Sequence, residues 1–222
     1  LLSSTRDVSN GVENWVKSVY LNTGSGWVSA TTTWNIPEPF IDEGSNSGTQ
    51  VVDVNNDGLA DVIRYIDYNT GDPDVRKTYL NNGAGWTEAG IEWKSPLPLG
   101  VSSASGQRFP LSARFTDING DGLVDLFDNN STNLSPTSSV YIGTGAGWTY
   151  DAQWSNYLEL MDSYIYSGTW FFDLGVRLFD IDGDNMIDMV KSGPTASYPT
   201  GSQETIVRTH KGNVPDLLTR VT

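Results

Sequence analysis

Three acidic loops of nine residues each carry the clearest chemistry in this sequence. They read DVNNDGLAD (53–61), DINGDGLVD (117–125) and DIDGDNMID (180–188). Oxygen-bearing side chains stand at positions 1, 3, 5 and 9, and position 7 can offer its main-chain carbonyl. This alternation suits Ca²⁺, a hard cation that binds roughly six to eight oxygens. One Ca²⁺ is expected in each loop, three in all. The expected ligands are Asp53, Asn55, Asp57, Leu59 and Asp61; Asp117, Asn119, Asp121, Leu123 and Asp125; and Asp180, Asp182, Asp184, Met186 and Asp188.

The flanks of the loops distinguish them from EF-hands. An EF-hand needs a bidentate Glu at position 12 and a helix on either side. Position 12 here is Arg64, Asp128 or Lys191, and short apolar segments rich in strand formers surround each loop. The loops are therefore expected to join two β-strands. A plain acidic turn is the alternative, and three copies at one spacing argue against it.

A second element recurs about 20 residues after two of the loops and once near the N-terminus. It reads YLNTGSGW (20–27), YLNNGAGW (79–86) and YIGTGAGW (141–148), and a second Trp follows each copy. The glycine-rich centres predict hairpin turns between strands. One repeat is thus a strand, an acidic loop, two strands, a glycine-rich turn and a fourth strand.

This pattern predicts an all-β fold, a β-propeller-like array of four-stranded antiparallel blades with calcium loops between strands. We expect one domain, 1–222, with four repeats at about 1–47, 48–109, 110–173 and 174–222. The first blade is incomplete, because it lacks its innermost strand and loop. Segments 35–47, 94–109 and 155–173 are predicted to be variable connections between repeats.

The composition excludes several functional classes. The chain carries 13 Lys and Arg against 27 Asp and Glu, a formal net charge of −14, so nucleic acids and anionic membranes are unfavourable partners. There is no Cys, the one His is His210, and no nucleophile or zinc motif is present, so we expect no catalytic residues. The high calcium concentration outside cells suits such loops, which predicts a secreted or cell-surface protein.

The abundant tryptophans make carbohydrate binding an alternative function to consider. Six of the eight Trp form repeat-equivalent pairs and are expected to pack between blades, mostly buried. Trp15 and Trp170 lie off the repeat and are better candidates for an exposed sugar platform. The paired residues are Trp27 with Trp34, Trp86 with Trp93, and Trp148 with Trp154.

The acidic loop on a four-strand repeat resembles the FG-GAP/VCBS repeat family, which implies a calcium-dependent β-propeller. The YLNxGxGW element and the segment 210–219 (HKGNVPDLLT) resemble the propeller that precedes the shell of bacterial Rhs/YD-repeat proteins and of B-type components of insecticidal toxin complexes. The Phe-Gly/Gly-Ala-Pro signature is poorly kept, and Asn185 replaces Gly in the third loop.

The resemblance implies a non-catalytic scaffold or binding module within a larger secreted or surface bacterial protein. The expected partner is a protein or the remainder of a longer parent chain, with self-association also open. A carbohydrate-binding adhesin or lectin is the alternative, with a glycan as the partner. No nucleic-acid partner and no membrane insertion are expected.

Overall fold

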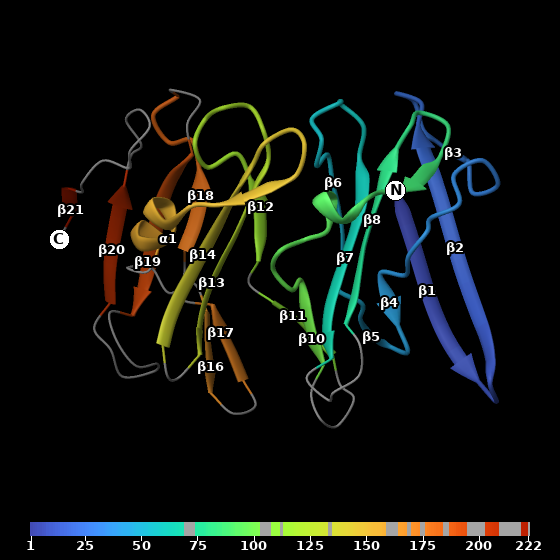
Figure 1. The fold of residues 1–222 in the computed structure, drawn as a ribbon, viewed down its shortest axis with the longest axis horizontal. Coiled ribbons are helices and arrows are strands. Elements are labelled where there is room, and N and C mark those ends of the chain that lie inside the picture. The colour runs from blue at the N-terminus through green and yellow to red at the C-terminus, as the bar shows by residue number, and fades with distance from the viewer. Residues whose placement is uncertain are drawn as a thin grey trace. The chain divides into compact units, whose positions relative to one another are not determined.

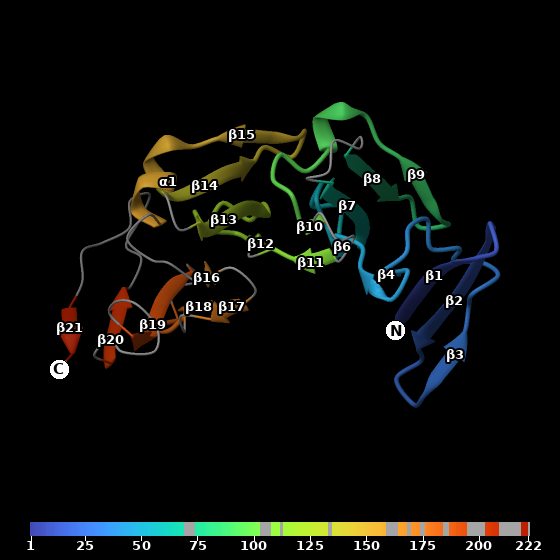
Figure 2. The same ribbon diagram turned by 90° about the horizontal axis from the view of Figure 1, so that it is seen from below.

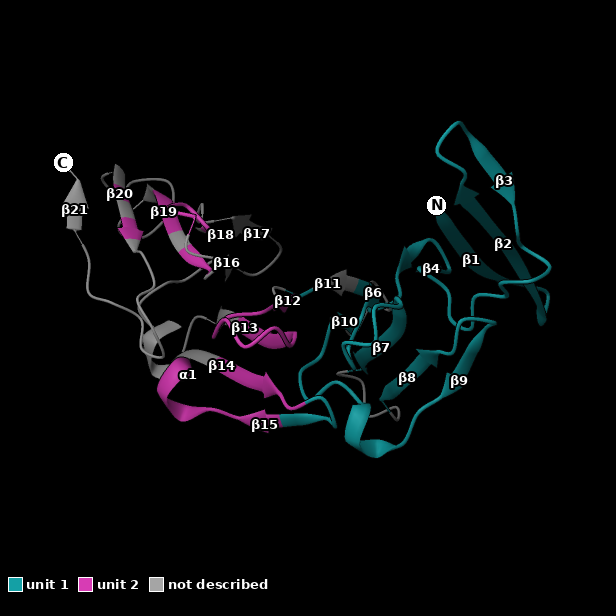
Figure 3. Ribbon diagram, turned by 90° about the horizontal axis from the view of Figure 1, so that it is seen from above, with its two compact units in different colours: residues 1–111, 145–148 teal, residues 112–144, 149–222 magenta. Residues whose placement is uncertain are grey.

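The computed structural model contains four β-sheets and almost no helix (Figure 1). It describes residues 1–68, 74–102, 108–111, 113–132, 135–158, 164–167, 170–173, 176–183, 187–194, 203–208 and 219–221. The chain divides into two compact units, residues 1–111 with 145–148, and residues 112–144 with 149–222 (Figure 3).

The first sheet of unit 1 has the strand order β3-β2-β1-β4-β5. Its long hairpin turns at Asn10 and Gly11, which both have positive φ (53° and 75°), the conformation that an Asn-Gly turn adopts most easily. The hairpin pairs from Leu2 opposite Val19 to Ser9 opposite Val12. The strands are β1 (Leu2–Ser9), β2 (Val12–Asn22), β3 (Trp27–Ser29), β4 (Ile41–Asp42) and β5 (Ser45–Asn46).

The second sheet of unit 1 has the order β11-β10-β7-β8-β9, and β6 also pairs with β7 (Figure 2). A single 3₁₀ turn, η1 (Ile91–Trp93), follows β9. The strands are β6 (Thr49–Val52), β7 (Asp61–Tyr68), β8 (Val75–Asn81), β9 (Trp86–Glu88), β10 (Gly100–Ser102) and β11 (Arg108–Pro110).

Two further sheets follow along the chain. The third has the order β15-β14-β13-β16-β17 with β12 also on β13, and the fourth is β18-β19-β20-β21. The elements are β12 (Arg114–Thr116), β13 (Asp125–Thr132), β14 (Ser135–Gly143), β15 (Trp148–Tyr150), α1 (Ala152–Leu158), β16 (Tyr164–Ser167), β17 (Trp170–Asp173), β18 (Val176–Phe179), β19 (Asp188–Pro194), β20 (Gln203–Arg208) and β21 (Thr219–Val221).

The order of strands within a repeat agrees with the sequence. Each acidic loop joins two antiparallel strands, β6 to β7, β12 to β13 and β18 to β19, and the first sheet starts with the equivalent of β7. The fourth sheet has the four strands expected, whereas the first three are larger. The segments predicted to be variable connections instead supply the hairpins β4–β5, β10–β11 and β16–β17. These hairpins join the central strand through parallel pairing, so the first three sheets are not purely antiparallel.

The edge of β7 is shared between β6 and β10, and two glycines permit this. β6 pairs with the first half of β7, and β10 pairs with the second half from Gly100 opposite Ile66. Tyr65 lies where the partner of β7 changes from β6 to β10. Its N–H donates to Gly48 O (3.0 Å), and its carbonyl oxygen accepts the Leu99 N–H (3.0 Å). Gly48 has φ +66°, and a Cβ there would lie 2.5 Å from the Tyr65 carbonyl oxygen. No other residue type fits this close approach of backbones.

The repeated tryptophans are less buried than expected. Trp154 is 9% exposed and belongs to a cluster with Ile118, Phe127 and Val140 in unit 2. Trp34 packs edge-on against Trp86, with ring centroids 5.3 Å apart. Trp27, by contrast, is 61% exposed. The expectation of a buried position is wrong for Trp27, which has no aromatic partner within the described ranges.

A buried carboxylate connects the two sheets of unit 1. Asp42 is fully buried, and its oxygens meet Arg6 Nε at 2.7 Å, Arg108 Nη1 at 2.8 Å and Arg64 Nη2 at 3.3 Å. Burial acts to raise the pKa of Asp42, but the hydrogen bond from Arg6 and the charges of the three arginines outweigh it. The pKa therefore lies below its ordinary value. Because the arginines come from β1, β7 and β11, this ion cluster joins segments far apart in the sequence.

We predict that Asp42→Asn lowers the free energy of unfolding by about 3–5 kcal/mol at neutral pH, since it leaves buried arginines without their counter-charge. The folded pKa of Asp42 is lowered, so its stabilisation is present above the ordinary Asp pKa of about 4 and is lost as the pH falls through the folded value. Urea unfolding of both proteins along a pH series should show the difference shrinking in acid. Glu43→Gln is the control, because Glu43 is half exposed and lies 3.5 Å from Arg108. A pH-independent difference would refute this account.

Candidate metal-binding loops

The first acidic loop folds around its own main-chain amides. The Asp53 carboxylate accepts the N–H groups of Asp57 (3.1 Å) and Gly58 (2.8 Å), and Asn55 Oδ1 also accepts from Asp57 N (3.2 Å). Asp57 Oδ1 then accepts the Leu59 N–H at 2.8 Å. Gly58, at position 6, has φ +85°, a left-handed conformation that glycine adopts without strain and that turns the loop sharply. The side chains at positions 1, 3 and 5 thus all accept main-chain amides of positions 5 to 7.

The second loop repeats these contacts at the same positions. Asp117 accepts the N–H groups of Asp121 (3.1 Å) and Gly122 (2.8 Å), and Asn119 Oδ1 accepts from Asp121 N (2.9 Å). Asp121 Oδ1 accepts the Leu123 N–H at 2.8 Å, and Gly122 also has φ +85°. Two loops 64 positions apart therefore share one hydrogen-bonding pattern.

The aspartate at position 9 has a structural role that the sequence did not reveal. Asp61 and Asp125 are fully buried, and Asp188 is 1% exposed. In every loop one oxygen of this carboxylate accepts the N–H of position 2, at 2.7–2.9 Å. The donors are Val54, Ile118 and Ile181.

In the first two loops the other oxygen of this carboxylate accepts an N–H group from the end of the next strand. Asp61 accepts the Asn81 N–H at 2.7 Å, and Asp125 accepts the Gly143 N–H at 2.8 Å. These donors stand directly before the glycine-rich turns, at the ends of β8 and β14. A Cβ on Gly143 would collide with the Val124 carbonyl oxygen. The last aspartate therefore fastens the loop to the neighbouring hairpin.

Burial of this carboxylate raises the free energy of its charged form. Burial raises the pKa of Asp125 to about 6, the N–H groups of Gly143 and Ile118 oppose the rise, and the charges of Asp121 and Asp117 add to it. The pKa of Asp61 is raised for the same reasons, burial first. A cation bound by the loop would offset this cost.

The third loop brings three carboxylates together. Oxygens of Asp180, Asp182 and Asp188 lie within 4.8 Å of one another, and the Gly183 N–H donates to Asp180 at 2.7 Å. Within the described part of the chain, no other three acidic, His or Cys side chains come this close. The expected ligands Asp184 and Met186 lie outside the described residues.

The first two loops offer carboxylate and amide oxygens, and the described part of the third loop offers carboxylates. Oxygen donors suit a hard cation such as Ca²⁺ better than transition metals, which prefer nitrogen or sulfur ligands. Leu59 and Leu123 directly follow the positive-φ glycines. That their carbonyls bind the metal at position 7 stays a prediction.

Comparison with known proteins adds no assignment. No protein-family model matches the chain, and no curated protein matches it.

None of the helices among the described residues is long and apolar enough to cross a bilayer.

We predict that Gly143→Ala lowers the free energy of unfolding by about 1–3 kcal/mol, because the new methyl group displaces β14 from the loop that Asp125 fastens to it. Gly85→Ala is the matched control, since a Cβ at Gly85 meets nothing within 4 Å. Urea unfolding in calcium-containing buffer measures both. Equal losses for the two variants would mean that the contact between loop and hairpin is not tight.

Proposed function

We propose that this chain is a non-catalytic, calcium-stabilised scaffold or binding module of the β-propeller type. The observation that carries the proposal is the shared geometry of the acidic loops, each ending in a buried aspartate that binds the loop's own second amide. A loop of this form places oxygens at every other position, and in the first two loops main-chain amides hold the carboxylates at position 1. Ca²⁺ is the cation that such an oxygen-only site suits best.

The propeller part of the proposal is supported by the repeated strand order. Three sheets have the same succession of strand, acidic loop, long central strand and antiparallel partner, and the first sheet starts at the central strand. Units of this size that stack their sheets side by side are typical of blades. The packing of Trp34 on Trp86, from successive repeats, fits this arrangement.

A structural role suits these carboxylates better than a catalytic one. The aspartates of the first two loops accept main-chain N–H groups, and a carboxylate that also holds Ca²⁺ is a poor general acid. Together with the resemblance to Rhs and toxin-complex propellers, this favours a scaffold in a secreted or surface bacterial protein. The proposed partner is another protein or the rest of a larger parent chain.

We predict that removal of calcium destabilises the protein. EDTA leaves the loop carboxylates without a counter-ion, whereas each filled site adds about 2.7 kcal/mol at a hundredfold excess of calcium over its Kd. Thermal unfolding should show a lower Tm in EDTA, restored by Ca²⁺ and less well by Mg²⁺, which prefers smaller octahedral sites. Metal analysis should find three Ca²⁺ per chain. Identical melting curves with EDTA and with calcium would disprove the proposed function.

We further predict that Asn55→Asp has opposite effects without and with calcium. The added carboxylate beside Asp53 and Asp57 gives the first loop the acidic pattern of the third, so repulsion should lower the Tm in EDTA. In calcium it should tighten binding by about tenfold, roughly 1.4 kcal/mol. Calorimetric titration and melting curves measure the two effects.

Asn14→Asp is the matched control for this charge change. Asn14 is exposed on β2, far in sequence from any acidic loop, so its variant should show no calcium-dependent shift. If Asn55→Asp behaves like Asn14→Asp, the loop does not bind calcium through position 3.

A further inference from the structure

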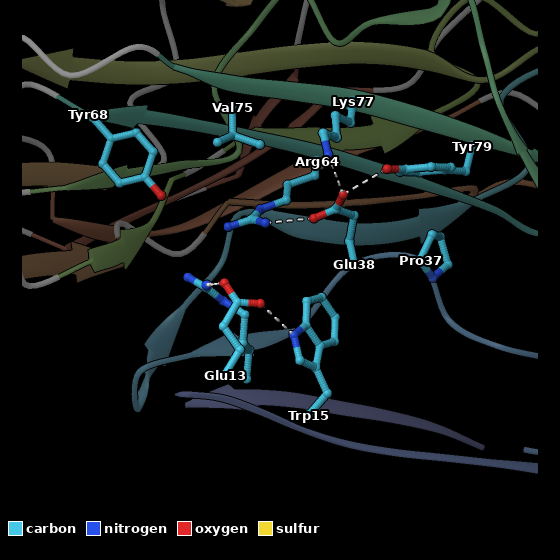
Figure 4. A pocket seen from close by; sticks show the side chains of 10 residues that line it. Glu13, Trp15, Pro37, Glu38, Arg64, Tyr68, Val75, Lys77 and Tyr79 are labelled. Carbon is cyan, nitrogen blue, oxygen red and sulfur yellow. Dashed lines mark hydrogen bonds and ion pairs between the residues drawn. The ribbon is translucent and has the colours of Figure 1, made fainter. Parts of the chain in front are cut away.

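A pocket of about 350 Å³ lies within unit 1, between the first and second sheets (Figure 4). Its volume falls in the range of small-molecule sites. Glu13 and Trp15 stand on β2 and face Arg64 and Glu38 across the opening. Tyr68 belongs to β7, whereas Val75, Lys77 and Tyr79 belong to β8; Arg6 and Pro37 complete the lining. None of these ten lining residues belongs to an acidic loop.

The charges in the pocket are balanced by pairs. Glu38 binds Arg64 at 2.6 Å and Lys77 at 3.3 Å, and Glu13 binds Arg6 at 3.0 Å. Asp42, Arg108 and Glu43 extend these pairs, so four cationic and four anionic side chains form one network. An anion such as phosphate would find each cation already neutralised, and a metal ion would find each carboxylate already paired. The pocket therefore suits an uncharged ligand with many hydrogen-bonding groups.

One wall of the pocket is aromatic. Trp15 is 36% exposed, and its indole N–H donates to Glu13 Oε2 at 3.2 Å, which fixes the orientation of the ring. Lys17 Nζ lies 4.4 Å from the centre of the same ring. The side chains of Pro37, Val75 and Tyr68 add further apolar lining. A flat aromatic face beside carboxylates and basic groups matches a sugar ring, which has an apolar C–H face and a rim of hydroxyls.

The polar groups are held in place before any ligand arrives. Glu38 is 4% exposed and Arg64 is 6% exposed, and Tyr79 Oη donates to Glu38 at 2.9 Å. Arg64 Nε also donates to the Ser47 carbonyl at 2.9 Å. A hydroxyl both donates and accepts, so it can bond to such a paired network without breaking an ion pair. Rigid polar groups of this kind lower the entropic cost of binding.

We propose that this pocket binds a neutral saccharide, with Trp15 as the stacking platform and Glu13, Glu38 and Lys77 as hydrogen-bonding groups to its hydroxyls. This inference goes beyond the proposed scaffold function and does not depend on calcium. Because the network is charge-balanced, neutral hexoses and N-acetylhexosamines are favoured over sialylated or uronic acid sugars.

A glycan array that includes neutral and acidic oligosaccharides tests the proposal with the intact chain in calcium buffer. The strongest neutral glycan is then titrated by calorimetry into the unmodified protein and two variants. Trp15→Ala should weaken binding at least about tenfold, since it removes the platform. Trp27→Ala is the matched control, because Trp27 is 61% exposed on β3 of the same sheet and does not line the pocket, and it should bind as the unmodified protein does.

Circular dichroism confirms that each variant is folded. If Trp15→Ala does not fold, Lys77→Met replaces it: the Lys77 side chain is 42% exposed, and the variant keeps the apolar stem while removing a donor. That variant should also weaken binding. The proposal is overturned if the protein binds no neutral glycan on the array or binds only acidic glycans. It is also overturned if the variants of pocket residues bind the neutral glycan as tightly as the unmodified protein does. A melting curve insensitive to EDTA would defeat the calcium proposal and leave this one standing.

Discussion

The buried carboxylate at the end of each acidic loop is the constraint on which the repeat depends. Asp61 and Asp125 are removed from water, yet each accepts one N–H from its loop and one from the end of the next strand. A buried charge is tolerated only when hydrogen bonds or a counter-ion stabilise it. The loop, the central strand and the glycine-rich turn are therefore positioned together, because all three must supply partners to one side chain.

A different interaction connects the first sheet to the second. Asp42, from the hairpin that pairs in parallel with β1, binds Arg6, Arg64 and Arg108. In this cluster the counter-charges are arginines of the chain itself, whereas Asp61 and Asp125 in the loops are held by main-chain amides. The chain thus uses two ways to keep carboxylates buried, and in the loops the proposed metal ion would add a counter-charge.

The sequence predicted the local parts of this structure well. The loops, the positive φ at Gly58 and Gly122, and the antiparallel strands around them follow from residue types at fixed spacing. The hairpins β4–β5, β10–β11 and β16–β17 were missed, because strands of two to four residues are too short to show a period of two. Contacts between segments far apart in the sequence could not be predicted either. Asp42 meets arginines that lie 36, 22 and 66 positions away, and no local pattern marks such a set.

The exposed and packed tryptophans show why burial could not be assigned from one repeat alone. Trp27 and Trp86 occupy equivalent places, yet Trp86 is half buried against Trp34 of the preceding repeat and Trp27 is 61% exposed. In repeat proteins each unit buries its apolar groups mainly against its neighbours, so burial is a property of the pair of repeats. The loops can therefore fix the conformation of one repeat, while the contacts between repeats decide how much apolar surface it buries. Trp15 lies where two successive sheets meet, so the saccharide pocket is a product of that pairing and could not be read from either repeat separately.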